Sequence, residues 1–91
     1  MLHLIVYDIA DDKRLRRVAK ICEDYGIRVE KSVFECDLPD VQFSEMWSML
    51  AEVILRDEDK VIDYPVGLSE RRKIRALGMG SHQEPQLTIV F

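Results

Sequence analysis

LHLIVYD, at residues 2–8, is the stretch that decides how this chain folds. Its apolar centre, Leu4 to Val6, is typical of a buried strand, and Asp8 follows where such a strand reaches solvent. A carboxylate held at a strand end is rigid enough to act as a metal ligand or a catalytic acid. The commoner role of such an acid is to cap the next turn by accepting hydrogen bonds from backbone N–H groups. These residues alone leave both roles open.

Length and composition point to one small domain over residues 1–91. Such a domain is too small to enclose a deep active site, so we expect any site to form at a subunit interface. The sequence lacks the run of ~18–20 apolar residues that would cross a bilayer, and no signal-peptide pattern precedes the first strand. Cys22 and Cys36 do not form a C-x-x-C pair, so a metal or redox site on cysteine is not expected. We therefore expect a cytoplasmic protein that does not contact a membrane.

The net charge of −4 hides a separation of charges along the chain. Residues 13–31 carry seven bases and three acids, whereas residues 32–70 carry ten acids and two bases. Four bases and one acid follow in residues 71–91. Phosphate binding responds to a local basic patch and not to the total charge. An acidic protein of this kind can therefore bind nucleic acid with one face.

Hydrophobic spacing and turn residues predict two helices among several strands. Gly26 is the residue type favoured just past a helix end, and Asp40 is a good N-cap. The expected elements are a strand at 2–7, a helix at 12–25, a strand at 28–35, a helix opening at Pro39 and Asp40, and strands at 60–66, 73–77 and 86–91.

This order predicts an α+β fold, namely a ferredoxin-like βαββαβ sandwich with an extra C-terminal strand. The final run, residues 87–91, is unusually apolar and would be an adhesive edge strand if left exposed. We therefore expect this strand, about residues 86–91, to pack on the sheet of a second copy in a homodimer.

Three segments together resemble a known family. They are YDIADD at residues 7–12, followed by an arginine-rich helix, SVFEC at residues 32–36, and DYPV at residues 63–66. The combination is similar to the small CRISPR-associated protein two (Cas-two) family of metal-dependent nucleases and subunits of the spacer-adaptation complex. The resemblance implies a homodimer in which Asp8 of both subunits faces the two-fold axis and holds one Mg²⁺, or Mn²⁺ in its place. Asp8 would then be both the metal ligand and the catalytic residue.

The basic residues next to Asp8 are candidates for binding nucleic acid. Arg17 matches the helix arginine of the family, and Arg14 and Arg16 are its neighbours; a guanidinium can donate two hydrogen bonds to one phosphate. The alternative is a solvated helix face that pairs with Glu23 or Asp24. Arg28 matches a second-strand arginine, and a cross-strand ion pair is its alternative.

Three further residues fall at motif positions and are expected to support the site. Tyr7 could position a phosphate or water through its hydroxyl, or pack at the sheet or dimer interface. Ser32 is expected to support the dimer site through a hydrogen bond, and Phe34 to be structural.

The resemblance implies a Mg²⁺-dependent endonuclease that cleaves single-stranded RNA or double-stranded DNA. It would act in CRISPR spacer acquisition with the integrase subunit. A non-catalytic dimeric scaffold that binds duplex DNA and the integrase is the first alternative. A ribonuclease toxin resembling virulence-associated protein D is the second.

Overall fold

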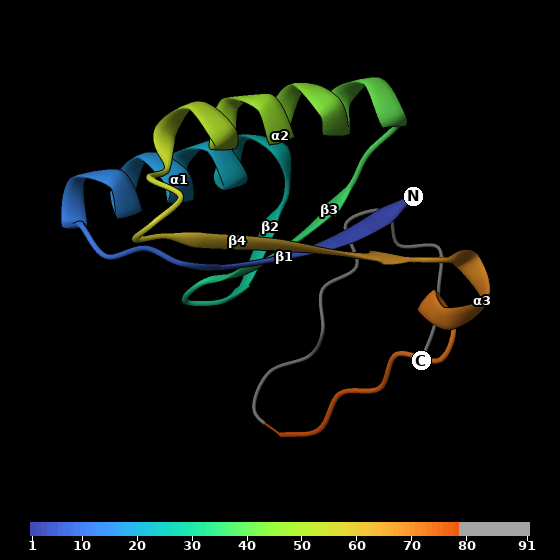
Figure 1. Ribbon diagram of the computed structural model, residues 1–91. Helices are drawn as coiled ribbons and strands as arrows, with labels where there is room; N and C mark the ends of the chain where they lie inside the picture. Colours follow the sequence, from blue (N-terminus) through green and yellow to red (C-terminus); the bar gives the residue numbers. More distant parts are fainter. Residues whose placement is uncertain (79–91) are drawn as a thin grey trace.

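The structure, a computed structural model, describes residues 1–78, which form an antiparallel sheet covered on one face by two helices (Figure 1). The strands are β1 (Leu2–Asp8), β2 (Ile27–Glu30), β3 (Val33–Asp37) and β4 (Lys60–Val66), in the spatial order β2-β3-β1-β4. The helices are α1 (Asp12–Tyr25), α2 (Asp40–Val53) and the short α3 (Leu68–Arg71). This arrangement confirms the predicted ferredoxin-like fold. No helix within residues 1–78 is long and apolar enough to span a membrane.

β1 lies in the middle of the sheet, and its two faces have different environments. It pairs with β3 on one side and with β4 on the other. Ile5 and Tyr7 are buried in the core beneath the helices, and His3 stacks on Phe43 of α2. Because side chains alternate along a strand, Asp8 lies on the opposite face from Tyr7.

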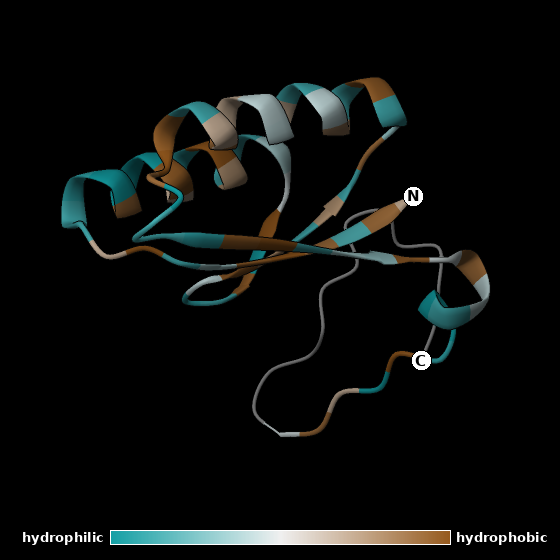
Figure 2. Cartoon of the chain, viewed as in Figure 1, coloured by the Kyte–Doolittle hydropathy of each residue, from teal (hydrophilic) through white to brown (hydrophobic). Residues whose placement is uncertain are grey.

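α1 forms where its hydrophobic spacing predicts it. The carboxylate of Asp11 caps its start by accepting a hydrogen bond from the Arg14 N–H at 2.9 Å, and this bond lowers the pKa of Asp11. Val18, Ile21 and Cys22 are buried against the sheet. Hydrophilic residues occupy the exposed start of α1, whereas hydrophobic residues are frequent in the central strands (Figure 2).

The single strand expected at residues 28–35 is instead a hairpin of β2 and β3. A two-residue turn at Lys31 and Ser32 separates them, and the pairing is irregular between Arg28 and Glu30. The prediction was wrong because the turn contains no Gly, Asn or Pro, the residues that usually mark a hairpin.

Three other expectations concern the start of α2 and the two strands expected after β4. Pro39 is the N-cap of α2, and Asp40 lies in the first helical turn, where its charge faces the positive end of the helix dipole. The strand expected at residues 73–77 is absent from the described chain, because the short helix α3 ends at Arg71 and irregular backbone follows. The strand expected at residues 86–91 lies outside the described residues.

Gly26 follows α1 for a different reason from the one predicted. Its φ of −160° is extended, so no left-handed helix cap forms. A Cβ at this position would lie 2.5 Å from Sγ of Cys36 and even closer to the carbonyl oxygen of Glu35. A glycine is needed because the chain passes directly against β3.

We predict that Gly26→Ala destabilises the protein by about 1–3 kcal/mol, because the new methyl group must displace β3 backbone. Chemical denaturation would measure the free energy of unfolding. Gly67→Ala is the control, since its Cβ would meet only the flexible end of Glu70, and it should change stability by less than about 0.5 kcal/mol. Equal effects of the two substitutions would contradict this account of Gly26.

We also predict that the two cysteines resist alkylation in the folded protein. Burial raises the pKa of Cys22 to about 12 and that of Cys36 to about 11, above the ordinary thiol value of about 8.5. The reactive thiolate is therefore scarcer in the folded than in the unfolded chain at pH 8. Iodoacetamide should modify both thiols in denaturant and neither under native conditions, as read by mass spectrometry. Rapid native labelling would contradict the burial of these side chains.

Candidate functional site

Asp8 is exposed at the end of β1, on the sheet face that α1 and α2 do not cover. Within residues 1–78 its carboxylate forms no hydrogen bond or ion pair. Its register partner on β4 is Lys60, which is also exposed. Capping of the adjacent turn falls to Asp11 and to Asp59, which accepts a hydrogen bond from the Ala10 N–H. Asp8 is therefore available to a ligand.

The sheet face that carries Asp8 is apolar around Val6, although Glu35 of β3, the register partner of Leu4, also lies on it. Val6 lies between Val33 of β3 and Ile62 of β4 in the register, and Leu4 lies next to Tyr64. Most of these side chains are only half-buried within the chain, and Tyr64 is 49% exposed. Asp8 thus ends a patch of exposed apolar surface.

Arg14 does not extend freely into solvent. Its Nε donates to Oδ2 of Asp59 at 2.8 Å, and its Nη2 donates to Oδ1 of Asp59 at 3.2 Å and to Glu58 at 3.0 Å. The Asp59 side chain is 0% exposed. Asp59 could not be selected from the sequence, because an acid in an acidic loop has no distinctive local pattern that reveals its burial.

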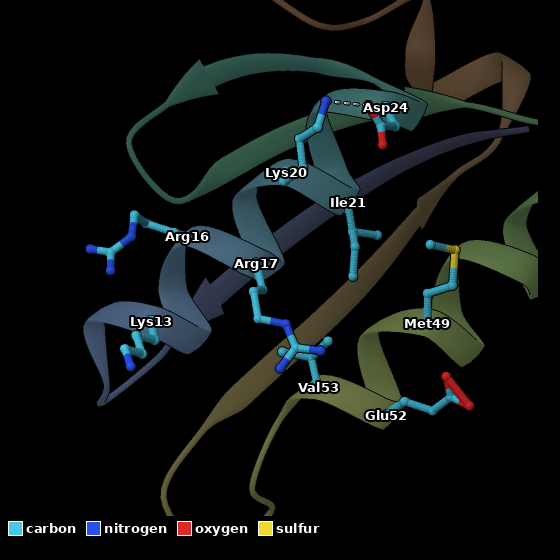
Figure 3. Close-up of a pocket in the computed structure, with 9 residues that line it drawn as sticks. All are labelled: Lys13, Arg16, Arg17, Lys20, Ile21, Asp24, Met49, Glu52 and Val53. Atoms are coloured by element: carbon cyan, nitrogen blue, oxygen red, sulfur yellow. Dashed lines mark hydrogen bonds and ion pairs between the residues drawn. The ribbon is translucent and has the colours of Figure 1, made fainter.

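Arg16 and Arg17 are exposed and form no ion pair within residues 1–78. Together with Lys13 and Lys20 they line a groove of about 630 Å³ between α1 and α2, whose other wall includes Met49 and Val53. Arg17 reaches toward Val53 of α2, whereas Arg16 points away from α2 (Figure 3). Lys20 is paired with Asp24 at 3.0 Å, as expected for a solvated helix face. Arg17 thus brings an unpaired guanidinium into the groove, which Glu52 also lines, whereas the unpaired guanidinium of Arg16 extends away from α2.

Arg28 lies on the helix side of the sheet and not beside Asp8. Its Nη2 is 3.4 Å from Glu23 of α1, and its guanidinium lies over the Phe34 ring at 5.1 Å. The alternative of an ion pair is therefore present, although it joins strand to helix and not strand to strand. A role of Arg28 in nucleic-acid binding stays a prediction.

Tyr7 and Phe34 pack in the core beneath the helices, and Ser32 lies in the turn of the β2–β3 hairpin; a role of the three residues in supporting the site stays a prediction. The Tyr7 hydroxyl donates a hydrogen bond to the carbonyl oxygen of Lys31 at 3.3 Å. The backbone N–H of Tyr7 donates to the carbonyl oxygen of Ser32 at 3.1 Å. Burial raises the pKa of the Tyr7 phenol. Phe34 is fully buried, with its ring 6.2 Å from that of Tyr7. These contacts hold the β2–β3 turn against β1, and the Tyr7 side chain lies on the opposite face from Asp8.

Asp8 is an exposed carboxylate without a protein partner in the described part of the chain. No group of three His, Cys, Asp or Glu side chains within residues 1–78 is arranged to hold a metal ion. Magnesium needs only one or two carboxylates, since waters complete its octahedral shell. One exposed carboxylate is thus a suitable half of a site shared by two chains.

Comparison with known proteins identifies the family. The family model described as CRISPR associated protein Cas2 matches residues 1–74. A CRISPR-associated endoribonuclease Cas2 from Nitratidesulfovibrio vulgaris is 35% identical, with 100% of this chain and 94% of the relative covered. A CRISPR-associated endonuclease Cas2 from Halalkalibacterium halodurans is 37% identical, with 86% of each protein covered. The crystal structure of Streptococcus pyogenes Cas2 at pH 6.5 matches with a TM-score of 0.75 and 37% identity, over 86% of this chain and 100% of that one. This chain belongs to the CRISPR-associated Cas2 family.

Proposed function

We propose that this protein is a homodimeric, Mg²⁺-dependent endonuclease of CRISPR spacer acquisition, acting with the integrase subunit on single-stranded RNA or double-stranded DNA. The observation that carries the proposal is the exposed, unengaged carboxylate of Asp8 at the border of an apolar sheet face. The names of the relatives, endoribonuclease and endonuclease, support phosphodiester cleavage as the reaction. Membership of this family also favours an adaptation role over that of a ribonuclease toxin.

The apolar face supplies the reason for a dimer. Leu4, Val6 and Ile62 would be removed from water if two copies met through this face, and that burial favours association. A two-fold axis close to the strand end would bring Asp8 of one chain near the Asp8 of the partner subunit.

Two such carboxylates fit a magnesium or manganese ion. Both ions accept carboxylate oxygens, and without a cation the two like charges would repel each other. When bound, the ion would polarise the phosphodiester and lower the pKa of an attacking water. Asp8 would hold and orient the ion, and the adjacent Lys60 ammonium would offset phosphate charge.

The two free arginines of the groove are the proposed phosphate contacts of the helical layer. Arg16 and Arg17 can each donate two hydrogen bonds to a phosphate, whereas Arg14 already donates to Asp59 and Glu58. We therefore assign phosphate binding to Arg16 and Arg17 and a structural role to Arg14.

A second candidate function is a non-catalytic DNA scaffold that bridges integrase subunits. The position of the groove favours it, because the groove lies in the helical layer and Asp8 lies on the other face of the sheet. A duplex held there need not reach Asp8.

We predict that Asp8→Asn lowers kcat for cleavage of RNA or duplex DNA by more than about a hundredfold, because loss of a ligand costs at least as much as loss of an outer-shell partner. Gel assays with Mg²⁺ and with chelator would measure it. Asp12→Asn is the matched control, an exposed acid of the same turn that should leave cleavage nearly unchanged. Full activity of Asp8→Asn would exclude the metal mechanism. Absence of cleavage by the wild type, with retained bridging of the integrase on DNA, would favour the scaffold.

We predict that the double variant Arg16→Gln with Arg17→Gln weakens binding to any nucleic-acid sequence alike. The slope of log affinity against log salt should fall by about 0.9 for each duplex phosphate contact that is lost. Fluorescence anisotropy over a range of salt would measure this slope. Arg56→Gln removes an exposed arginine outside the groove and should leave the slope unchanged. Equal slopes for the wild type and the double variant would exclude phosphate contact at this groove.

A further inference from the structure

We propose that Asp59 is a positioning residue for Asp8, and that it acts with Arg14 to fix the strand end from which the Asp8 carboxylate projects. This inference rests on the proposed function of Asp8. It assigns a role to a buried acid that lies outside the sequence motifs.

Asp59 joins three separate segments through its side chain alone. Oδ1 accepts hydrogen bonds from the Ala10 N–H at 2.9 Å and from Nη2 of Arg14 at 3.2 Å. Oδ2 accepts from Nε of Arg14 at 2.8 Å and from the Leu55 N–H at 2.9 Å. The turn after β1, the first turn of α1 and the segment after α2 therefore meet at one carboxylate.

The negative charge of Asp59 is neutralised by a direct ion pair with Arg14. Its carboxylate is out of contact with solvent, and a buried charge requires a partner and hydrogen bonds. Arg14 supplies both, and its hydrogen bonds, more than those of Leu55 and Ala10, hold the pKa of Asp59 well below its ordinary range. Asp59 therefore stays ionised, and its four acceptor positions remain occupied.

These contacts lie on both sides of Asp8. Ala10 is two residues beyond Asp8 along the chain, and Asp59 directly precedes Lys60, the register partner of Asp8. Asp8 and Lys60 are the last register pair between β1 and β4, and Asp59 holds the chain next to both of them. Without it, the Asp8–Lys60 pair would be a free ladder end, which readily frays.

A metal ion shared across a two-fold axis is sensitive to such fraying. Each chain supplies one carboxylate ligand, so a change that displaces Asp8 displaces both protein ligands of the ion in the dimer. Groups that orient a ligand without touching the metal typically contribute about 10–100-fold to metal affinity.

The chain contains a matched control at the opposite end of β1. Arg71 donates to Asp37 at 2.8 Å, and Asp37 is the register partner of Leu2. The Arg71 and Asp37 side chains are 10% and 19% exposed, against 17% and 0% for Arg14 and Asp59, so both ion pairs lie largely out of solvent and Asp59 is the more buried acid. Loss of this pair should destabilise the fold without moving Asp8.

The test compares Asp59→Asn, Asp37→Asn and Asp8→Asn in the full-length protein. Mn²⁺ affinity is measured by electron paramagnetic resonance of the free ion, and Tm is measured without metal. We expect Asp59→Asn to weaken Mn²⁺ binding about 10–100-fold, and Asp37→Asn to change it less than about twofold even though it lowers Tm. Arg14→Lys keeps the charge but loses the paired hydrogen bonds, so it should weaken Mn²⁺ binding by an intermediate factor. It also serves as the test if Asp59→Asn does not fold.

Two results would overturn the inference. One is that Asp59→Asn, or Arg14→Lys in its place, binds Mn²⁺ like the wild type while Asp8→Asn does not bind it. The other is that the Asp59 and Asp37 variants lose Mn²⁺ affinity in equal proportion to their loss of Tm, which would show a merely structural role. If Asp8→Asn itself keeps full Mn²⁺ affinity, the proposed function fails as well, and this outcome is distinct from the other two.

Discussion

The pairing of β1 on both of its edges is the constraint on which the rest of the structure depends. A strand with β3 on one side and β4 on the other cannot slip by one residue without moving every side chain to the opposite face of the sheet. Tyr7 is therefore fixed in the core, where it holds the β2–β3 turn, and Asp8 is fixed on the opposite face. β1 thereby places a core side chain on one face of the sheet and the carboxylate proposed for metal binding on the other.

Local pattern predicted the parts of the fold that depend on local physics. The helix at residues 12–25 has a capping acid at Asp11 and regularly spaced apolar residues, so its bounds were correct. The hairpin was missed because Lys31 and Ser32 are not one of the glycine-containing pairs typical of two-residue hairpin turns. The role of Gly26 was misread because a close approach to β3 is a tertiary contact, which no neighbouring residue reveals.

At the candidate site, too, local features could be predicted from the sequence and tertiary contacts could not. Asp8 could be selected from the sequence because a strand end next to a basic helix is visible there. The engagement of Arg14 could not be predicted, because Asp59 lies 45 positions away and reaches it only through the folded chain. In the sequence, the basic helix offers five cations that cannot be told apart. The fold divides them into those that bind the protein itself and those left for a ligand.

The apolar face around Asp8 has a consequence for how the protein would respond to its own concentration. If two copies join through that face as proposed, the surface that stabilises the pair and the carboxylates that hold the ion come together in one step. Mass action then governs both properties, since stability of an associating protein depends on protomer concentration. At high dilution the separated chains would each retain Asp8 and yet lack a complete metal site. At concentrations near the dissociation constant of the pair, nuclease capacity would therefore rise more steeply than the amount of protein.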